Sequence, residues 1–176
     1  MLTGRTVYLR PLKVVDSASI FAGLQDEEAL YMTATRKVFT KEEVKEAVCQ
    51  FERDSSRHDF AICLVKSGEI IGDLAIIEID LDNNKAMYRI ALHHKNQYGK
   101  GYGTEATMLA QQFVFEELQL NRLELQVYSH NPRGIASYKK AGFKQEGVLR
   151  QALYMNDVYS DEIIMSVLYE DYRRKQ

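Results

Sequence analysis

Along most of the chain, apolar residues either alternate with polar residues or run together in short stretches. Both patterns are typical of β-strands, the first with one buried face and the second with two. Polar segments rich in Gly, Asn, Asp and Ser separate these stretches, as expected for turns. Strands are therefore predicted over residues 7–12, 60–65, 70–80, 86–92, 122–128, 143–155 and 158–168.

Other segments carry signals of α-helices. The sequence Thr40-Lys-Glu-Glu43 is a capping box, and apolar residues follow it at positions that share one helix face. An Asn-Pro pair at 131–132 is an N-terminal signal, and Gly142 stands where a helix C-terminal glycine is expected. Helices are predicted after Asp16, after Thr40, over residues 104–117 and between 132 and 142. Because the helices alternate with the strands, we expect a mixed sheet with helices on its faces.

Composition narrows the class of protein. The 176 residues are 45% hydrophobic and 27% charged, which is typical of one soluble globular domain, here residues 1–176. A formal net charge of −2 argues against a nucleic-acid partner. The sequence has neither a signal peptide nor a long apolar run, so we expect no membrane association and a cytoplasmic location. Cys49 and Cys63 stand in apolar settings, which predicts buried free thiols and no metal site.

Three closely spaced glycines, Gly99, Gly101 and Gly103, separate a predicted strand from a predicted helix. A glycine turn of this kind exposes backbone N–H groups at the positive end of the helix dipole, where phosphate binds. The spacing matches neither the dinucleotide fingerprint nor the nucleoside-triphosphate loop. The glycines therefore indicate either a phosphate site or a tight strand-to-helix turn.

Two motifs resemble the GCN5-related N-acetyltransferase (GNAT) superfamily, in particular the branch of ribosomal-protein N-terminal and spermidine acetyltransferases. Residues 99–106 resemble its GKGYxTEA turn, and residues 131–143 resemble its NxxAxxxYxKxGF motif. The resemblance covers nearly the whole chain, because the Leu-Arg-Pro-Leu segment at 9–12 also fits this branch. It implies an α/β (α+β) fold with a mixed, mostly antiparallel sheet of six to seven strands, flanked by about four helices.

The resemblance also implies acetyl-CoA as cosubstrate and a set of residues that hold it. Backbone amides of the glycine turn would bind the pyrophosphate, and the preceding strand would pair with the pantetheine arm. Tyr138 would lie near the thioester sulfur and donate a proton to the departing thiolate. The implied acetyl-CoA-binding residues are Ile90, Leu92, Gly99, Lys100, Gly101, Tyr102, Gly103, Thr104, Asn131 and Lys140. Dimers are common in this family, so a homodimer is a further expectation.

Acetyl transfer needs a neutral amine, whereas an α-amine has a pKa of about 8 and a lysine-like amine of about 10. A general base is therefore useful. Glu78, on the strand before the glycine strand, is the first candidate, and it could equally be a solvated strand residue. His93 or His94 at the end of the glycine strand, or a water chain, are the alternatives.

The expected acceptor is a primary amine, either a protein or peptide N-terminus or a small amine. Met87 occupies a position where many spermidine-type members place a glutamate, and Arg36 and Lys37 would repel a polycation. A polyamine or aminoglycoside acetyltransferase remains an alternative, and it would need an acidic acceptor cleft. A non-catalytic acyl-CoA-binding sensor is the alternative outside enzymes.

Overall fold

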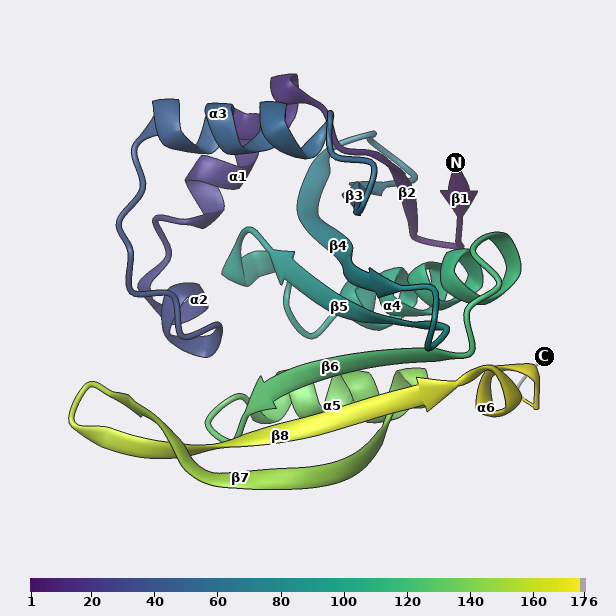
Figure 1. The fold of residues 1–176 in the computed structure, drawn as a ribbon. Coiled ribbons are helices and arrows are strands. Elements are labelled where there is room, and N and C mark those ends of the chain that lie inside the picture. The colour runs from purple at the N-terminus through teal and green to yellow at the C-terminus, as the bar shows by residue number, and fades with distance from the viewer. Residues whose placement is uncertain (175–176) are drawn as a thin grey trace.

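The computed structural model describes residues 1–174, which form an eight-stranded sheet in the order β1-β2-β3-β4-β5-β6-β8-β7 (Figure 1). Neighbouring strands are antiparallel except β5 and β6, which are parallel. The expectation of a mixed, mostly antiparallel sheet is thus confirmed. The strands are β1 (Leu2–Thr3), β2 (Val7–Pro11), β3 (His58–Leu64), β4 (Ile70–Asp80), β5 (Lys85–Leu92), β6 (Arg122–Tyr128), β7 (Lys144–Met155) and β8 (Val158–Leu168).

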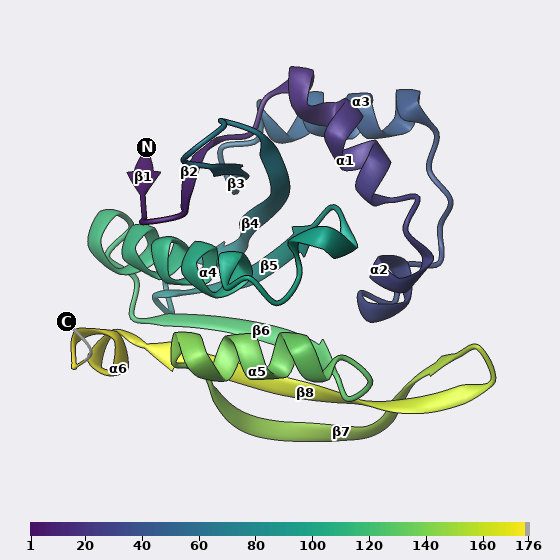
Figure 2. The ribbon, with the colours of Figure 1, turned by 180° about the vertical axis from the view of Figure 1, so that it is seen from behind.

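Helices cover both faces of this sheet. α4 and α5 lie together on one face, as the view from behind shows (Figure 2), and α1 and α3 pack on the other face. The α-helices are α1 (Ser17–Gly23), α2 (Glu27–Met32), α3 (Lys41–Phe51), α4 (Tyr102–Gln112), α5 (Pro132–Ala141) and α6 (Tyr169–Arg173).

The element count exceeds the predicted six to seven strands and about four helices. The additional strand is β1, whose two residues pair with Tyr8 and Leu9 of β2. The additional helices are α2 and α6, which have six and five residues. Elements this short contain too few turns for a helical or alternating pattern to stand out in the sequence.

The predicted helix ends are confirmed in detail. Thr40 Oγ1 accepts a hydrogen bond from the Glu43 amide at 3.1 Å, and the Glu43 carboxylate accepts one from the Thr40 amide at 2.8 Å. Asn131 caps α5 by accepting from the Gly134 amide at 2.9 Å. At the other end of α5, Gly142 has a φ of 105°, in the left-handed region that favours glycine.

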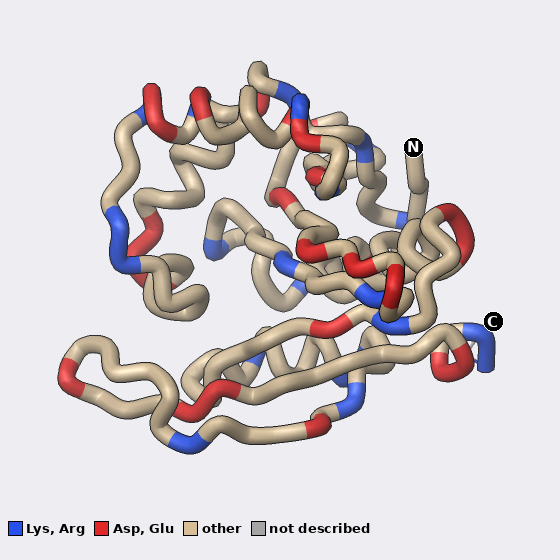
Figure 3. Tube along the Cα trace, in the orientation of Figure 1, with Lys and Arg blue, Asp and Glu red and all other residues tan. Residues whose placement is uncertain are grey.

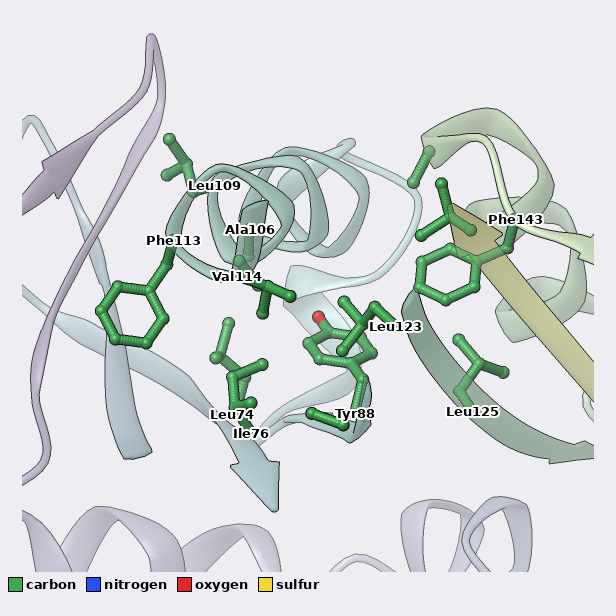
Figure 4. Close-up of a cluster of buried hydrophobic side chains, with 14 of the residues drawn as sticks. Leu74, Ile76, Tyr88, Ala106, Leu109, Phe113, Val114, Leu123, Leu125 and Phe143 are labelled. Carbon is green, nitrogen blue, oxygen red and sulfur yellow. The ribbon is translucent and has the colours of Figure 1, made fainter. Parts of the chain in front are cut away.

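The main core lies between the sheet and α4. Figure 4 shows Ala106 and Leu109 of α4 above Leu74 and Tyr88 of the strands. The helix predicted over residues 104–117 begins two residues earlier and changes at its C-terminal end into a π-helical turn, Phe113–Glu117. This packing fixes the start of α4 against the end of β5.

The parallel pairing of β5 with β6 is short and determines where the site lies. It comprises only Lys85 with Arg122, Ala86 with Leu123, and Met87 with Glu124. Beyond Met87, β5 stays paired with β4, whereas β6 follows β8, so the two strands separate. Within the described residues 1–174, the β6-facing edge of β5 therefore has no strand partner over residues 88–92.

Candidate functional site

The glycine turn lies where β5 leads into α4. Gly99 and Gly101 have φ values of 73° and 85°, which L side chains rarely adopt. A Cβ placed on either glycine would meet no atom within 4 Å, so both face open space. α4 begins at Tyr102, and its first amides have no partner within the helix. The turn thus offers unpaired N–H groups, an uncovered backbone and the positive end of a helix dipole, which suits a pyrophosphate.

A cavity of about 340 Å³ extends from this turn into the opening between β5 and β6. It is bounded by the end of β5, the start of α4, one side of α5 and the region of α2. The cavity therefore reaches both faces of the sheet, since α5 and α2 approach it from opposite sides (Figures 1 and 2). Its lining comprises Ala29, Met32, Thr33, Ile90, Ala91, Leu92, Gln97, Tyr98, Gly99, Gly101, Tyr102, Gly103, Thr104, Asn131, Arg133, Gly134, Ala136, Ser137, Tyr138 and Lys140.

All of the sequence-predicted residues belong to this lining except Lys100, Glu78 and the alternative bases His93 and His94. Lys100 is exposed in the glycine turn. Among the lining residues that sequence reasoning missed, Gly134 and Ser137 could have been found, because they follow Asn131 at helical spacing toward Tyr138. Ala29 and Met32 of α2 carry no sequence signal, because only the tertiary fold brings α2 to the cavity.

Two polar contacts hold α5 against α4, and the first of them lies at the cavity. The hydroxyl groups of Thr104 and Ser137 lie 2.8 Å apart, and Gln111 Nε2 donates to the Ala141 carbonyl at 3.0 Å. The helix start is equally close-packed, since a Cβ on Gly134 would lie 2.7 Å from Asn131 Nδ2. Glycine at 134, where the family pattern has Ala or Ser, therefore lets the Asn131 side chain fold over the helix end.

Tyr138 lies on α5 with its ring edge-on to Tyr88 and Phe143, at centroid distances of 6.4 and 6.0 Å. Burial raises the pKa of Tyr138 to about 12. The phenol therefore carries its proton at neutral pH. Within residues 1–174, its hydroxyl has no hydrogen-bond partner, so it is available to a group in the cavity.

Tyr98 directly precedes the glycine turn, and α5 places a cation beside it. The Arg133 guanidinium lies over the Tyr98 ring, 4.5 Å from its centroid, which is a cation–π contact. Burial raises the pKa of Tyr98, so this ring remains neutral. Arg133 also pairs with Glu28 of α2, which in turn lies 3.4 Å from Lys95 Nζ.

A second contact fixes α2 at the mouth of the opening. His130, at the end of β6, donates from Nε2 to the Tyr31 carbonyl at 2.8 Å, and its ring stacks on that of Tyr31 at 4.2 Å. Together with the Glu28 pairs, this contact joins α2 to the β6 side of the cavity. The short helix is thus positioned by its neighbours.

The three candidate bases lie in different surroundings. Glu78 occupies an irregularity in β4 with a φ of 49°, is exposed, and is not part of the cavity lining. His94 is also exposed. His93 is only 2% exposed, and its ring nitrogens contact Ser19 Oγ at 2.9 Å and Asp73 Oδ1 at 2.7 Å.

Along the chain trace, the positions of Lys and Arg are mixed with those of Asp and Glu throughout the fold (Figure 3). Among the residues that the structure describes, no group of His, Cys, Asp and Glu is arranged to hold a metal ion. In the same part of the chain, no helix has the length and apolar character needed to cross a membrane.

Comparison with known proteins identifies the family. Residues 6–144 match the family model described as an acetyltransferase (GNAT) domain. A probable N-acetyltransferase of Bacillus subtilis, YjcK, is 30% identical, with 97% of this chain and 98% of that protein covered. The Escherichia coli spermidine N(1)-acetyltransferase is 33% identical over 60% of this chain and 56% of its own length. The chain belongs to the GNAT family, and it is an acetyl-CoA-dependent N-acetyltransferase.

The fold agrees with this assignment. The structure of spermidine N-acetyltransferase from Vibrio cholerae, solved in complex with CoA and spermine, superimposes with a TM-score of 0.87. The match covers 95% of this chain and 98% of that one, at 23% identity. At this level of identity the likeness concerns the fold, so the acceptor of the present protein must be argued from its own residues.

Proposed function

We propose that this protein transfers the acetyl group of acetyl-CoA to a primary amine, either a peptide N-terminus or a small amine. The observation that carries the proposal is the cavity between β5 and β6, which joins the glycine turn to the Tyr138 side chain. The end of the cavity at the glycine turn suits a pyrophosphate, and its middle part lies beside the protonated phenol of Tyr138. A thioester held along β5 would reach the phenol while remaining open to the opposite face of the sheet.

The residues present fit the expected cosubstrate. Backbone amides at the start of α4 would hold the pyrophosphate, because the positive φ values of Gly99 and Gly101 leave that backbone uncovered. The unpaired edge of β5 at Ile90 and Leu92 would hydrogen-bond the pantetheine amides as a neighbouring strand does. Asn131 and Lys140 on α5 would contact the same arm.

In the transfer, the amine nitrogen attacks the thioester carbon, a C–N bond forms and the C–S bond breaks. The nitrogen loses one proton and the sulfur gains one. Tyr138 would donate a hydrogen bond to the departing sulfur. Because its pKa of about 12 lies above the value of about 8.5 that is usual for a thiol, complete transfer from tyrosine is uphill. The proton lost by the amine therefore balances the reaction, and Tyr138 stabilises the developing thiolate.

We do not assign the role of general base to Glu78. It lies between Ile77 and Asp80, which pair with Met87 and Lys85, away from the lining residues at the other end of β5. Water in the cavity is the simplest proton acceptor. Water is sufficient as proton acceptor for an α-amine, because such an amine has a pKa of about 8 and is partly neutral at neutral pH.

A polyamine acetyltransferase is the second candidate, because several of the similar proteins are spermidine N-acetyltransferases. One face of β5 argues against a polyamine acceptor. Met87 and exposed Arg89 occupy alternate positions of this strand, on the face that points away from α4, where the acceptor would enter. A cationic side chain there disfavours a second ammonium group.

Two measurements test the proposal. Acetyl-CoA at one hundred times its Kd should stabilise the fold by about 2.7 kcal/mol in thermal unfolding. Release of free thiol from acetyl-CoA should then depend on an added amine. Binding without turnover for any amine would support the sensor alternative, and the absence of a thermal shift would contradict the cosubstrate assignment itself.

A further inference from the structure

Two oppositely charged residues, Asp73 of β4 and Arg89 of β5, lie on the same face of these neighbouring strands. In the antiparallel register of β4 and β5, Asp73 is opposite Ala91 and Ala75 is opposite Arg89. Residues at alternate positions share a face, so Asp73 and Arg89 point to the same side. The other side of these strands is the core under α4, which contains Leu74 and Tyr88. Asp73 and Arg89 therefore face away from α4, toward α1 and α2.

Their place in the strands puts both residues beside the cavity. Asp73 and Arg89 are not themselves part of the cavity lining. They border it, because Ala91, directly opposite Asp73, and Ile90, which follows Arg89, belong to the lining. Diagonal neighbours in an antiparallel pair are about 7–8 Å apart, and a long side chain spans that distance. A small molecule that enters from this side can therefore contact both charges at once.

The Asp73 carboxylate is held by one oxygen and open at the other. His93 Nε2 lies 2.7 Å from Asp73 Oδ1, and since a carboxylate only accepts, this nitrogen donates. His93 Nδ1 then accepts from the Ser19 hydroxyl at 2.9 Å. Asp73 is 31% exposed, and its two cross-strand neighbours, Ala61 and Ala91, are too small to cover it.

The histidine that holds Asp73 is itself firmly fixed. A Cβ added to Gly23 of α1 would lie 3.0–3.1 Å from atoms of His93, so the helix packs directly on the histidine. The nearby Arg10 guanidinium is engaged by the Asp16 carboxylate, with both contacts at 2.7 Å.

Arg89 differs from its neighbours in having no partner. It is exposed, and within residues 1–174 its guanidinium forms no ion pair. An unpaired guanidinium beside a cleft is suited to a planar carboxylate, which it binds with two parallel hydrogen bonds.

We propose that Asp73 and Arg89 select an acceptor that carries both an amine and a carboxylate. This inference rests on the proposed acetylation of an amine. Asp73 accepts a hydrogen bond from the amine, and Arg89 binds the carboxylate. His93 is a positioning residue that orients Asp73. The substrate class is therefore an amino acid-like amine or a peptide N-terminus followed closely by an acidic side chain.

Three acceptors of equal length test the pair: 4-aminobutanoate, n-butylamine and 1,4-diaminobutane, which end in a carboxylate, a methyl group and an ammonium. Three peptides that begin Ala-Asp, Ala-Asn and Ala-Lys repeat the comparison on an N-terminus. In at least one set, kcat/KM should be about tenfold higher for the anionic member, equivalent to about 1.4 kcal/mol. Arg89→Gln should bring the members of that set within about twofold of each other.

Variants of the other two residues separate their roles. Asp73→Asn should raise KM for every acceptor while the Kd for acetyl-CoA stays unchanged. His93→Leu should do the same, whereas His93→Gln, which keeps a donor, should retain most of the acceptor affinity. Arg53→Gln, at an exposed arginine after α3 that forms no ion pair within residues 1–174, is the matched control and should change nothing.

The outcomes distinguish this inference from the proposed function. Turnover with a preference for the ammonium or methyl member, or a carboxylate preference that survives Arg89→Gln, overturns the charge-pair assignment and leaves amine acetylation intact. The charge-pair assignment is also overturned if neither the amines nor the peptides show a preference for the anionic member, or if none of them is acetylated. If the unmodified protein did not bind acetyl-CoA, that result would instead contradict the proposed function.

Discussion

The hydroxyl groups of Thr104 and Ser137 lie 2.8 Å apart and join the first turn of α4 to the middle of α5. Thr104 belongs to the turn that would bind the pyrophosphate, and Ser137 precedes Tyr138. One hydrogen bond thus links the element that would hold the cosubstrate to the element that carries Tyr138.

This link predicts coupling between the two helices. Thr104→Val and Ser137→Ala should each weaken acetyl-CoA binding, and the double variant should lose less than the sum of the single losses. A shared contact of this kind gives an interaction energy of about 0.5–3 kcal/mol in a double-mutant cycle. Calorimetric titration of the four proteins measures it, and strictly additive losses would show that the hydroxyl pair does not join the two sites.

Two glycine substitutions should separate the effect of backbone strain on stability from the effect on acetyl-CoA binding. Gly101→Ala should destabilise the fold by about 1–2 kcal/mol, because alanine is strained at a φ of 85°. It should also weaken acetyl-CoA binding, since the new methyl group would stand where the pyrophosphate approaches. Gly68→Ala, in a hairpin turn with a φ of 72°, is the matched control. Gly68→Ala should lower the stability measured by urea unfolding by a similar amount and leave the Kd for acetyl-CoA unchanged. If both variants changed this Kd equally, the glycine turn would not be the pyrophosphate site.

The proposed role of Tyr138 predicts a specific kinetic change. Tyr138→Phe should lower kcat by a factor of about 10²–10⁴ while the Kd for acetyl-CoA stays within about twofold. Because the pKa of Tyr138 is raised to about 12, the unmodified enzyme should lose no activity through tyrosine ionisation up to about pH 10. Thiol release measured between pH 6 and 10 tests both points. Tyr159→Phe, at an exposed tyrosine of β8, is the control, and an unchanged kcat in Tyr138→Phe would return Tyr138 to a packing role.

An ion pair at the far end of the sheet predicts sensitivity to acid. Hydrogen bonds from Arg122 and then Ser166 lower the pKa of Glu146 to about 2, from its ordinary value of 4.5. A lowered pKa means that the unfolded chain binds the proton more readily. The contribution of Glu146 to stability is therefore present above pH 4.5 and is lost as the pH falls toward 2.

Urea unfolding at pH 6 and pH 3 measures this effect. The unmodified protein should lose more stability between the two values than Glu146→Gln, which has no proton to gain. Glu69→Gln, at an exposed glutamate in the turn between β3 and β4, is the control and should behave like the unmodified protein. Identical pH dependence in all three proteins would exclude a role for the Arg122 pair.

The parts of the fold that the sequence predicts well are those set by neighbouring residues. Thr40 and Glu43 cap α3 as expected, and Asn131 and Gly142 mark the ends of α5, because each of these interactions closes within a few residues. The glycine turn was located for the same reason. Its assignment to acetyl-CoA depended on a family resemblance, since glycine spacing alone also fits an ordinary tight turn.

Features created by distant segments were not predictable. Ala29 and Met32 reach the cavity because Glu28 and Tyr31 contact residues about one hundred positions later in the chain. Glu78 was placed on a regular strand, but a register shift between Ile77 and Asp80 gives it a positive φ and an exposed position. Such irregularities arise from the pairing of whole strands, and the local pattern does not contain them.

The short pairing of β5 with β6 has a consequence for the protein before its cosubstrate arrives. Over residues 88–92, β5 presents a row of unpaired backbone donors and acceptors to the opening, as an edge strand does. Such an edge is a template on which a stray extended segment from another chain could align. Because the pantetheine arm would occupy the same backbone groups, we expect bound acetyl-CoA to protect the enzyme from unwanted association through this edge during heating and storage, in addition to serving as its acetyl donor.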